Sequence, residues 1–271
     1  MPNFFALIPG ANWQHPNPRL QSAWRFARIG FLIFPVLPSV GTLPIFIALV
    51  LTWVNSSAEI LRHRVNWWLA LLGLWSIVVS LLAIEPGDAL LGLANILPFF
   101  GFFAAYSVLI QTLEQMRQLA WIFLLAAIPT ILLGFGELWL GWGGDITIAG
   151  TPIHIWGLTP GGTPLGRMSS LFGYATGLAE YLQMVFIFGL GLWVDTWENR
   201  SDSRRAKLTF GNSGAMTTKS VQTPKLIYLS VFLLLCGVAL IFTSSRSAWG
   251  GAIASMLIFA VDQSWYWVLG V

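Results

Sequence analysis

Five long apolar stretches limit what this chain can fold into. A helix that crosses a bilayer needs roughly 20 predominantly apolar residues. Stretches close to that length are Trp67–Ile84, Ala89–Ile110, Leu119–Leu140, Ser170–Val194 and Leu226–Phe242. Only 9 % of the residues are charged, whereas a soluble domain carries about 25 %. Too few charges remain to cover a water-facing surface, so the sequence predicts an all-α, multi-pass membrane protein.

Two further segments decide how often the chain crosses. Ala248–Val261 is a shorter apolar stretch. Ile29–Val54 is apolar almost throughout but is broken by three prolines and a glycine: Pro35, Pro38, Gly41 and Pro44. It is either one kinked span or a hairpin of two short passes, because its length fits both. A re-entrant hairpin enters the membrane and returns without crossing it. Like a hairpin of two passes, it would leave both ends of the segment on one side of the membrane.

The distribution of basic residues favours the hairpin, because loops on the cytoplasmic side are enriched in Lys and Arg. A hairpin places 12 of the 14 basic residues on that side, whereas a single span divides them 5 against 9. We therefore predict about eight membrane segments. Residues 1–28 form a cytoplasmic N-terminal arm and residues 195–225 a cytoplasmic, unstructured basic loop. Residues 141–168 form an external loop that folds onto the outer membrane face.

Two basic residues, Arg167 and Arg246, fall on the opposite side, each at a membrane boundary in Ser-rich surroundings. One interpretation is that both side chains reach the phospholipid headgroups. The other is a binding site, with Ser245 in support, because a guanidinium group binds phosphate through two hydrogen bonds. The start of a membrane helix adds backbone donors for an anion. Together these residues suit a diphosphate group or a smaller anion.

Three more residues are candidates for chemistry. Glu180 lies inside a predicted span, where a carboxyl group is a functional candidate by default; a glutamate packed between helices is the alternative. Glu137 lies close to Trp139 and the outer surface, so we expect it to be exposed to water. His154 is the one histidine expected outside. It is the candidate catalytic base, with an ordinary loop residue as the alternative.

Other function classes are not supported by the sequence. It contains no Walker loop, no dinucleotide-binding glycine pattern and no nucleophile-elbow serine motif, which argues against ATP-driven work by this chain alone. Three histidines and a single cysteine, Cys236, do not provide a metal-ligand cluster. We therefore expect no metal, no cofactor and no nucleic-acid partner, and membrane lipid as the surrounding partner.

Two short motifs resemble those of the O-antigen ligase and polymerase family. The first is Arg167-Met168-Ser169-Ser170-Leu171-Phe172-Gly173, followed by Ala179-Glu180-Tyr181-Leu182. The second is Phe242-Thr243-Ser244-Ser245-Arg246-Ser247-Ala248-Trp249-Gly250, which is similar to the Ser-Arg-Gly-Ala-Trp turn of that family. A cyanobacterial branch described as bicarbonate transporters carries both motifs. The Asn-Pro-Asn turn of the family is replaced here by Tyr174-Ala175-Thr176.

The resemblance implies a bacterial inner-membrane protein with a partial, GT-C-like helical bundle over residues 29–271. Members transfer a glycan from a polyprenyl diphosphate carrier without metal, in cell-envelope polysaccharide assembly. The match covers only the first part of a typical member, which continues into an external loop with a catalytic histidine. We therefore expect a C-terminally truncated chain that is inactive alone and needs a second polypeptide. A bicarbonate or small-anion transporter and a non-catalytic membrane scaffold are the alternative functions.

Overall fold

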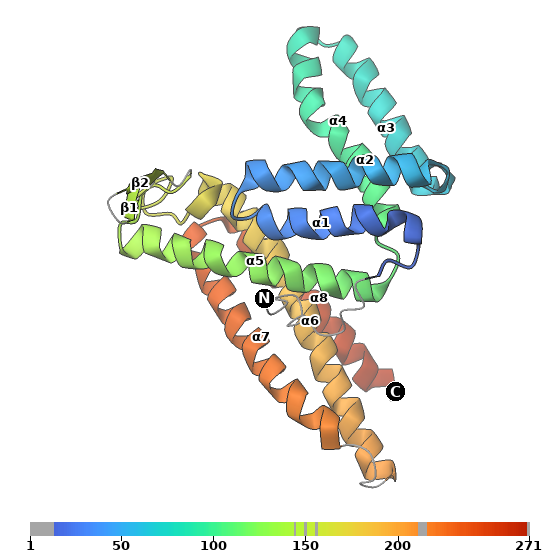
Figure 1. The fold of residues 1–271 in the computed structure, drawn as a ribbon, viewed down its shortest axis with the longest axis vertical. Helices are drawn as coiled ribbons and strands as arrows, with labels where there is room; N and C mark the ends of the chain where they lie inside the picture. The colour runs from blue at the N-terminus through green and yellow to red at the C-terminus, as the bar shows by residue number, and fades with distance from the viewer. Residues whose placement is uncertain (1–13, 144, 149–150, 155–156, 211–215, 270–271) are drawn as a thin grey trace. The chain divides into compact units, whose positions relative to one another are not determined.

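The computed structural model describes residues 14–143, 145–148, 151–154, 157–210 and 216–269. They form two compact units, the first from residues 1–34 and 38–119 and the second from residues 35–37 and 120–271. Nearly all of the described chain is helical (Figure 1). The longest non-helical part is residues 157–169, and an antiparallel hairpin of β1 (Asp145–Ile148) and β2 (Thr151–His154) pairs Ile146 with Ile153.

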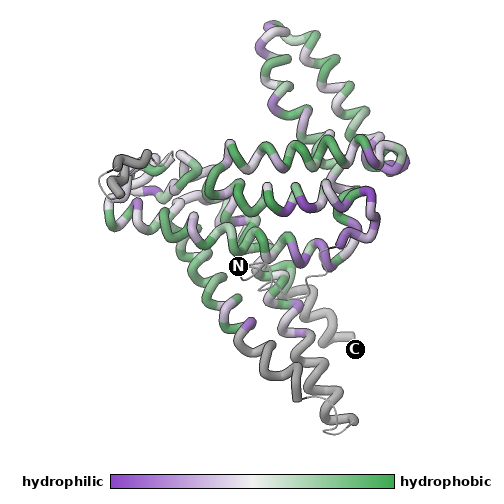
Figure 2. The backbone as a smooth tube through the Cα atoms, in the orientation of Figure 1, coloured by the Kyte–Doolittle hydropathy of each residue, from purple (hydrophilic) through white to green (hydrophobic). Residues whose placement is uncertain are grey.

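Within the described residues, six helices are long and apolar enough to cross a membrane. They are α2 (Pro38–Arg62), α3 (Arg64–Leu81), α4 (Pro86–Leu109), α5 (Leu113–Trp139), the part Ala175–Glu198 of α6 and the part Lys225–Thr243 of α7. Hydrophobic residues follow these helices along most of their length (Figure 2). The prediction of a helical, multi-pass membrane protein is therefore confirmed at this level, for six of the eight predicted segments.

The N-terminal hairpin is present, but its two helices differ in length. α1 (Gln21–Ile33) and α2 are joined by a turn at residues 34–37. The helices approach closely at a glycine, because a Cβ atom on Gly41 would lie 2.3 Å from the Cα of Phe34. Thirteen residues span only about 20 Å, less than the hydrocarbon core of a bilayer, whereas α2 is long enough to cross. The expectation of two short arms is therefore wrong for α2. The first arm also begins earlier than predicted, inside residues 1–28.

A buried histidine ties the chain ahead of α1 to the end of α4. The His15 side chain is 5 % exposed. Its Nε2 donates to the carbonyl of Leu109 at 2.9 Å, since a carbonyl oxygen can only accept, and its Nδ1 lies 2.9 Å from both the backbone N–H and the carbonyl of Asn17. The residues just before α1 are thus part of the first unit's packed structure rather than a free arm.

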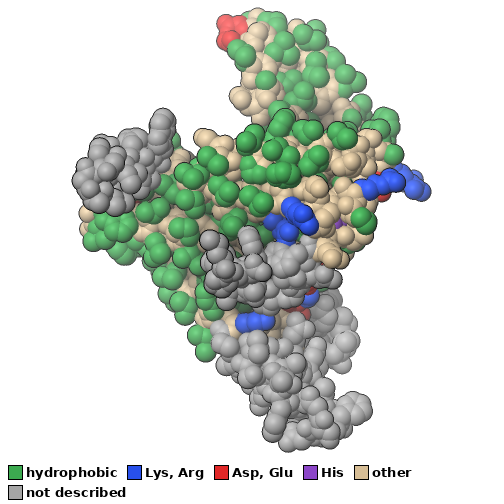
Figure 3. All heavy atoms as spheres, in the orientation of Figure 1, with side chains coloured by type: hydrophobic (Ala, Val, Ile, Leu, Met, Phe, Trp, Pro, Cys, Tyr) green, Lys and Arg blue, Asp and Glu red, His purple; other side chains and the backbone are tan. Residues whose placement is uncertain are grey.

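The helices α3 and α4 pair as an apolar hairpin. Few of their side chains are buried, and Trp67, Trp68 and Trp75 are among the exposed ones. Figure 3 shows hydrophobic side chains over this hairpin, with acidic side chains at its tip. Such an apolar, exposed pair is the arrangement expected of helices that face lipid.

The helix α5 starts earlier than the hydrophobic pattern predicts, at Leu113 rather than Leu119. The cause is a capping box. The backbone N–H of Gln115 donates to Oγ1 of Thr112 at 3.3 Å, while the Gln115 side chain accepts from the N–H of Thr112 at 3.0 Å. Two free N–H groups at the helix start are satisfied in this way, so residues 113–118, four of which are polar, join the helix.

The second unit continues with η3 (Ser170–Phe172), α6 (Ala175–Phe210), α7 (Met216–Thr243) and α8 (Arg246–Leu269). α6 and α7 lie side by side (Figure 1). The expectation of an unstructured basic loop at residues 195–225 is wrong over most of that range, because α6 continues to Phe210 and α7 begins at Met216. Residues 211–215 lie outside the described residues.

Candidate functional site

The two sequence motifs form adjoining parts of the second unit. We call residues 157–174 the arginine loop and residues 243–246 the serine turn. The Nε of Arg167 donates to the carbonyl of Thr243 at 2.8 Å, and the N–H of Met168 donates to the carbonyl of Phe242 at 2.9 Å. Segments about 75 residues apart in the sequence are therefore joined directly at Arg167.

Glu137 holds the other side of the arginine loop. Its Oε1 accepts hydrogen bonds from the N–H of Thr159 at 3.0 Å and the hydroxyl of Ser169 at 2.8 Å. Its Oε2 accepts from the N–H groups of Ser169 at 3.0 Å and Ser170 at 2.7 Å. Both oxygens thus have two donors each, which is close to the full accepting capacity of a carboxylate.

The expectation that Glu137 is exposed to water is therefore wrong, since its side chain is 0 % exposed. The prediction rested on its nearness to Trp139 at the end of the span. The arginine loop folds back over this end of α5 and covers the carboxylate. A buried carboxylate is costly unless it is hydrogen-bonded, and here the loop provides the bonds.

One face of α5 receives the loop over two helical turns. The hydroxyl of Ser170 donates to the carbonyl of Thr130 at 2.7 Å. Between Thr130 and Glu137, a Cβ atom on Gly134 would lie 2.1 Å from the methyl carbon of Met168. The positions 130, 134 and 137 share a helix face, so the segment from Met168 to Ser170 packs against this face of α5.

Every backbone N–H from Arg167 to Ser170 donates a hydrogen bond. That of Arg167 donates to the carbonyl of Pro164 at 3.0 Å, and the other three donate to Phe242 and Glu137, as described above. This segment is therefore fixed by its own loop, by α7 and by α5. Arg167 itself is half-buried, and neither terminal nitrogen of its guanidinium group is hydrogen-bonded to a described residue.

Arg246 is the first residue of α8 and its side chain is exposed. Ser245, just before it, is 5 % exposed, and its hydroxyl lies 3.2 Å from that of Ser247. The backbone at Ser244 has a φ of 51°, a conformation that a residue other than glycine adopts only when its surroundings hold it. The serine turn thus presents Arg246 at the start of a helix, where N–H groups lack partners inside the helix.

Glu180 lies on α6 near the level of the serine turn. α6 and α8 run side by side in the same direction. A Cβ atom on Gly251 would lie 1.9 Å from the Gln183 amide nitrogen, and one on Gly191 would lie 3.8 Å from the Phe259 ring. In both pairs the two residue numbers differ by the same amount, so the two helices stay in one register. Measured along the helix axes, Glu180 therefore lies within about one helical turn of Arg246. Its side chain is exposed, so the interpretation that it packs between helices is wrong.

His154 is the last residue of β2, with its backbone opposite Asp145. The placement of its side chain lies outside what the structure describes. Among the side chains that are described, no group of three or more His, Cys, Asp or Glu residues could hold a metal ion. The two motifs bring the half-buried Arg167 to the turn that precedes Arg246, and the carboxylate of Glu137 is fully hydrogen-bonded to the arginine loop.

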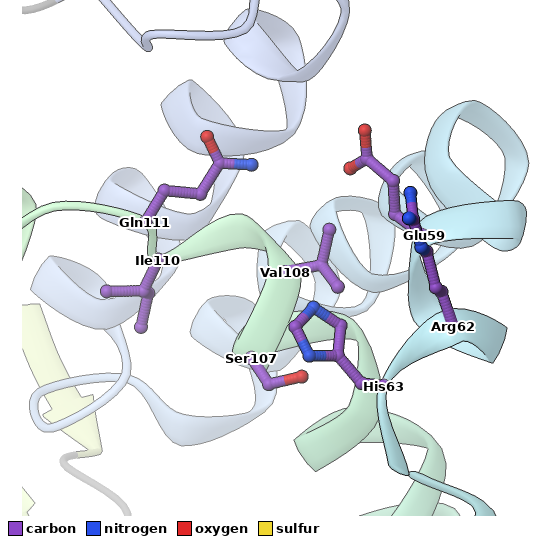
Figure 4. Close-up of a pocket in the computed structure, with 7 residues that line it drawn as sticks. All are labelled: Glu59, Arg62, His63, Ser107, Val108, Ile110 and Gln111. Carbon is purple, nitrogen blue, oxygen red and sulfur yellow. The ribbon is translucent and has the colours of Figure 1, made fainter. Parts of the chain in front are cut away.

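The first unit has a separate open cleft of about 670 Å³. Figure 4 shows Glu59, Arg62 and His63 on one side and Ser107 and Gln111 on the other. Its lining mixes one acidic and two basic side chains, and all three are exposed. The cleft has no single charge preference, so it does not define a ligand class.

The sequence alone did not identify Thr243, Ser169 or Thr159 as parts of the site. Thr243 acts through its backbone carbonyl, and Thr159 through its backbone N–H. Neither role depends on the side chain, so no residue pattern reveals it. The adjacent Ser169 and Ser170, next to Arg167 in the first motif, were the one available signal.

Comparison of the chain with models of protein families, with characterised proteins and with solved structures finds no match. The fold defines the class of this protein as a mainly helical membrane protein with several passes. Its further assignment depends on the two motifs and on the contacts between them.

Proposed function

We propose that this chain is an O-antigen ligase- or polymerase-like glycosyltransferase of the bacterial inner membrane. It acts on glycans linked to polyprenyl diphosphate, in cell-envelope polysaccharide assembly. The observation that carries the proposal is the bond from Arg167 to the carbonyl of Thr243 at 2.8 Å. It holds one arginine against the turn that precedes the other, so the two arginines lie on adjoining segments.

The chemistry of such a transfer fits these groups. The acceptor hydroxyl attacks the anomeric carbon of the glycan, the bond from that carbon to the diphosphate oxygen breaks, and the hydroxyl proton goes to a base. Negative charge grows on the departing diphosphate, and guanidinium groups held in place beforehand stabilise it. Arg167 and Arg246 bind the diphosphate, Ser245 and Glu180 support the site, and His154 is the candidate base.

The first prediction concerns the fork shape of the guanidinium group. Lysine keeps the charge but loses the paired hydrogen bonds. We expect Arg167→Lys and Arg246→Lys each to weaken the binding of a polyprenyl diphosphate analogue by roughly tenfold, since a hydrogen bond to a charged group contributes about 1.5–3 kcal/mol. Titration of purified protein in detergent or nanodiscs measures the affinity.

Arg117→Lys is the matched control, because Arg117 lies at the opposite end of α5 and pairs with Glu114 at 3.7 Å. It should leave the affinity unchanged. Unchanged affinity in both Arg167→Lys and Arg246→Lys would instead indicate that these side chains serve only as contacts to phospholipid headgroups.

The second prediction concerns orientation. We expect the N-terminus and residues 195–225 on the cytoplasmic side and the arginine loop outside, because a hairpin of α1 and α2 that returns to its own side of the membrane places 12 of the 14 basic residues inside. Leu165 is 85 % exposed, so Leu165→Cys should react with a membrane-impermeant thiol reagent in intact cells. Ser213→Cys should react only after the cells are opened. The native Cys236 is buried, which keeps the background low. Labelling of Ser213→Cys from outside would reverse this topology.

A further inference from the structure

The N–H and hydroxyl groups around Glu137 form an anion-binding pocket that the chain fills with its own side chain. Three backbone N–H groups, from Thr159, Ser169 and Ser170, and the Ser169 hydroxyl point at the two carboxylate oxygens. Converging backbone N–H groups bind anions in many proteins. The position of the Ser169 hydroxyl is fixed by a further hydrogen bond, because its oxygen also accepts from the N–H of Thr163 at 3.1 Å.

This pocket is connected to Arg167 through consecutive residues. Ser169 and Ser170 are bound to Glu137, Met168 to Phe242, and Arg167 to Thr243. Loss of the carboxylate would leave four donors without acceptors. Three of them are on the buried residues Ser169 and Ser170, where an unpaired donor is costly. The loop would then rearrange to reach other acceptors, and Arg167 would move with it.

We propose that Glu137 is the positioning residue of the arginine site and that its pocket accepts a small carboxylate ion when the side chain is removed. The inference depends on the proposed function only for the role of Arg167 toward a diphosphate. Glu137 does not touch the substrate in this proposal. It acts through Ser169 and Ser170, which fix the segment that carries Arg167.

The test removes the carboxylate and supplies it again from solution. Glu137→Ala keeps the Cβ atom and lacks a group the size of acetate. We expect this variant to bind the diphosphate analogue roughly tenfold more weakly than the wild type. Acetate or formate at millimolar concentration should restore both the affinity and the thermal stability. Chloride at equal ionic strength should restore neither.

Two comparisons make the test specific. Glu114→Ala removes a half-buried glutamate at the other end of α5, and acetate should not change its stability or its affinity. Glu137→Gln keeps the size of the side chain but turns an NH₂ group toward a donor. It should lose affinity and should not respond to acetate, because the pocket is still filled.

A double-mutant cycle separates positioning from general destabilisation. If Glu137 acts through Arg167, Glu137→Ala should cost almost no further affinity once Arg167 is alanine. Additive losses would overturn the positioning role, as would an unchanged affinity of Glu137→Ala in a protein whose wild type binds the analogue. A wild type that does not bind the analogue would overturn the proposed function instead. In that case the acetate-dependent stability of Glu137→Ala still tests the pocket, and no stabilisation would overturn the carboxylate site.

Discussion

Gly162→Ala is expected to abolish binding of the diphosphate analogue and to lower the melting temperature. Gly162 has a φ of 81°, and a Cβ atom there would lie 1.8 Å from the carbonyl oxygen of Arg167. The left-handed conformation alone costs alanine about 1–2 kcal/mol. The contact adds more, because the obstacle is backbone and the Arg167 peptide must move away. Thermal unfolding and analogue titration measure the two effects.

Gly166→Ala provides the matched control within the same loop. Gly166 has a φ of 83°, and no atom lies within 4 Å of the position of its Cβ. This variant carries the conformational cost without the clash, so it should lose stability but retain most of its affinity. Equal losses in the two variants would show that displacement of Arg167 is not the cause.

The double variant Arg167→Ala/Arg246→Ala should show the second large effect. A hydrogen bond to a charged group contributes about 1.5–3 kcal/mol, so each truncation should weaken analogue binding roughly 10- to 150-fold. The pair should lose between about 100-fold and 20,000-fold if both cations contact one diphosphate. Arg62→Ala/Arg64→Ala, which removes two arginines of the first unit, should change the affinity little.

The same double variant separates the candidate functions. A glycosyltransferase, assayed together with the second polypeptide that the resemblance implies, should lose turnover of a lipid-linked glycan when both arginines are replaced, with no effect on bicarbonate movement. A small-anion transporter in proteoliposomes should instead lose flux of labelled bicarbonate. A scaffold would show neither activity in the wild type. Bicarbonate flux that depends on Arg246 would therefore overturn the proposed glycan transfer.

The helices were predictable because the signal that forms them is local. A run such as Ala89–Ile110 must be helical in lipid, since no water is present to satisfy its backbone groups. The start of α5 was missed because a capping box at Thr112 and Gln115 extends the helix into polar sequence. The basic segment at residues 195–225 was misjudged because its composition favours disorder, yet α6 and α7 extend well into it.

The candidate site was only partly predictable. Arg167 and Arg246 could be identified from the sequence because they are the two basic residues predicted on the outer side of the membrane. The role of Glu137 could not be read from the sequence, since its donors come from Thr159 and from Ser169 and Ser170, 22 to 33 residues further along. Such a pocket depends on how the loop folds back, and no periodic pattern records that path.

The bonding of residues 167–170 also bears on motion. The segment is fastened to α5 through Glu137 and to the end of α7 through Phe242 and Thr243, and the rings of Trp139 and Phe242 meet edge to face at 5.3 Å. A slide of α7 along α5 by one helical turn, about 5.4 Å, would break all of these contacts together. These contacts therefore hold α5 and α7 in a fixed register at this end of the second unit. A transporter that works by helix sliding would have to break them in every cycle, whereas transfer at a fixed anion site can proceed while they stay intact.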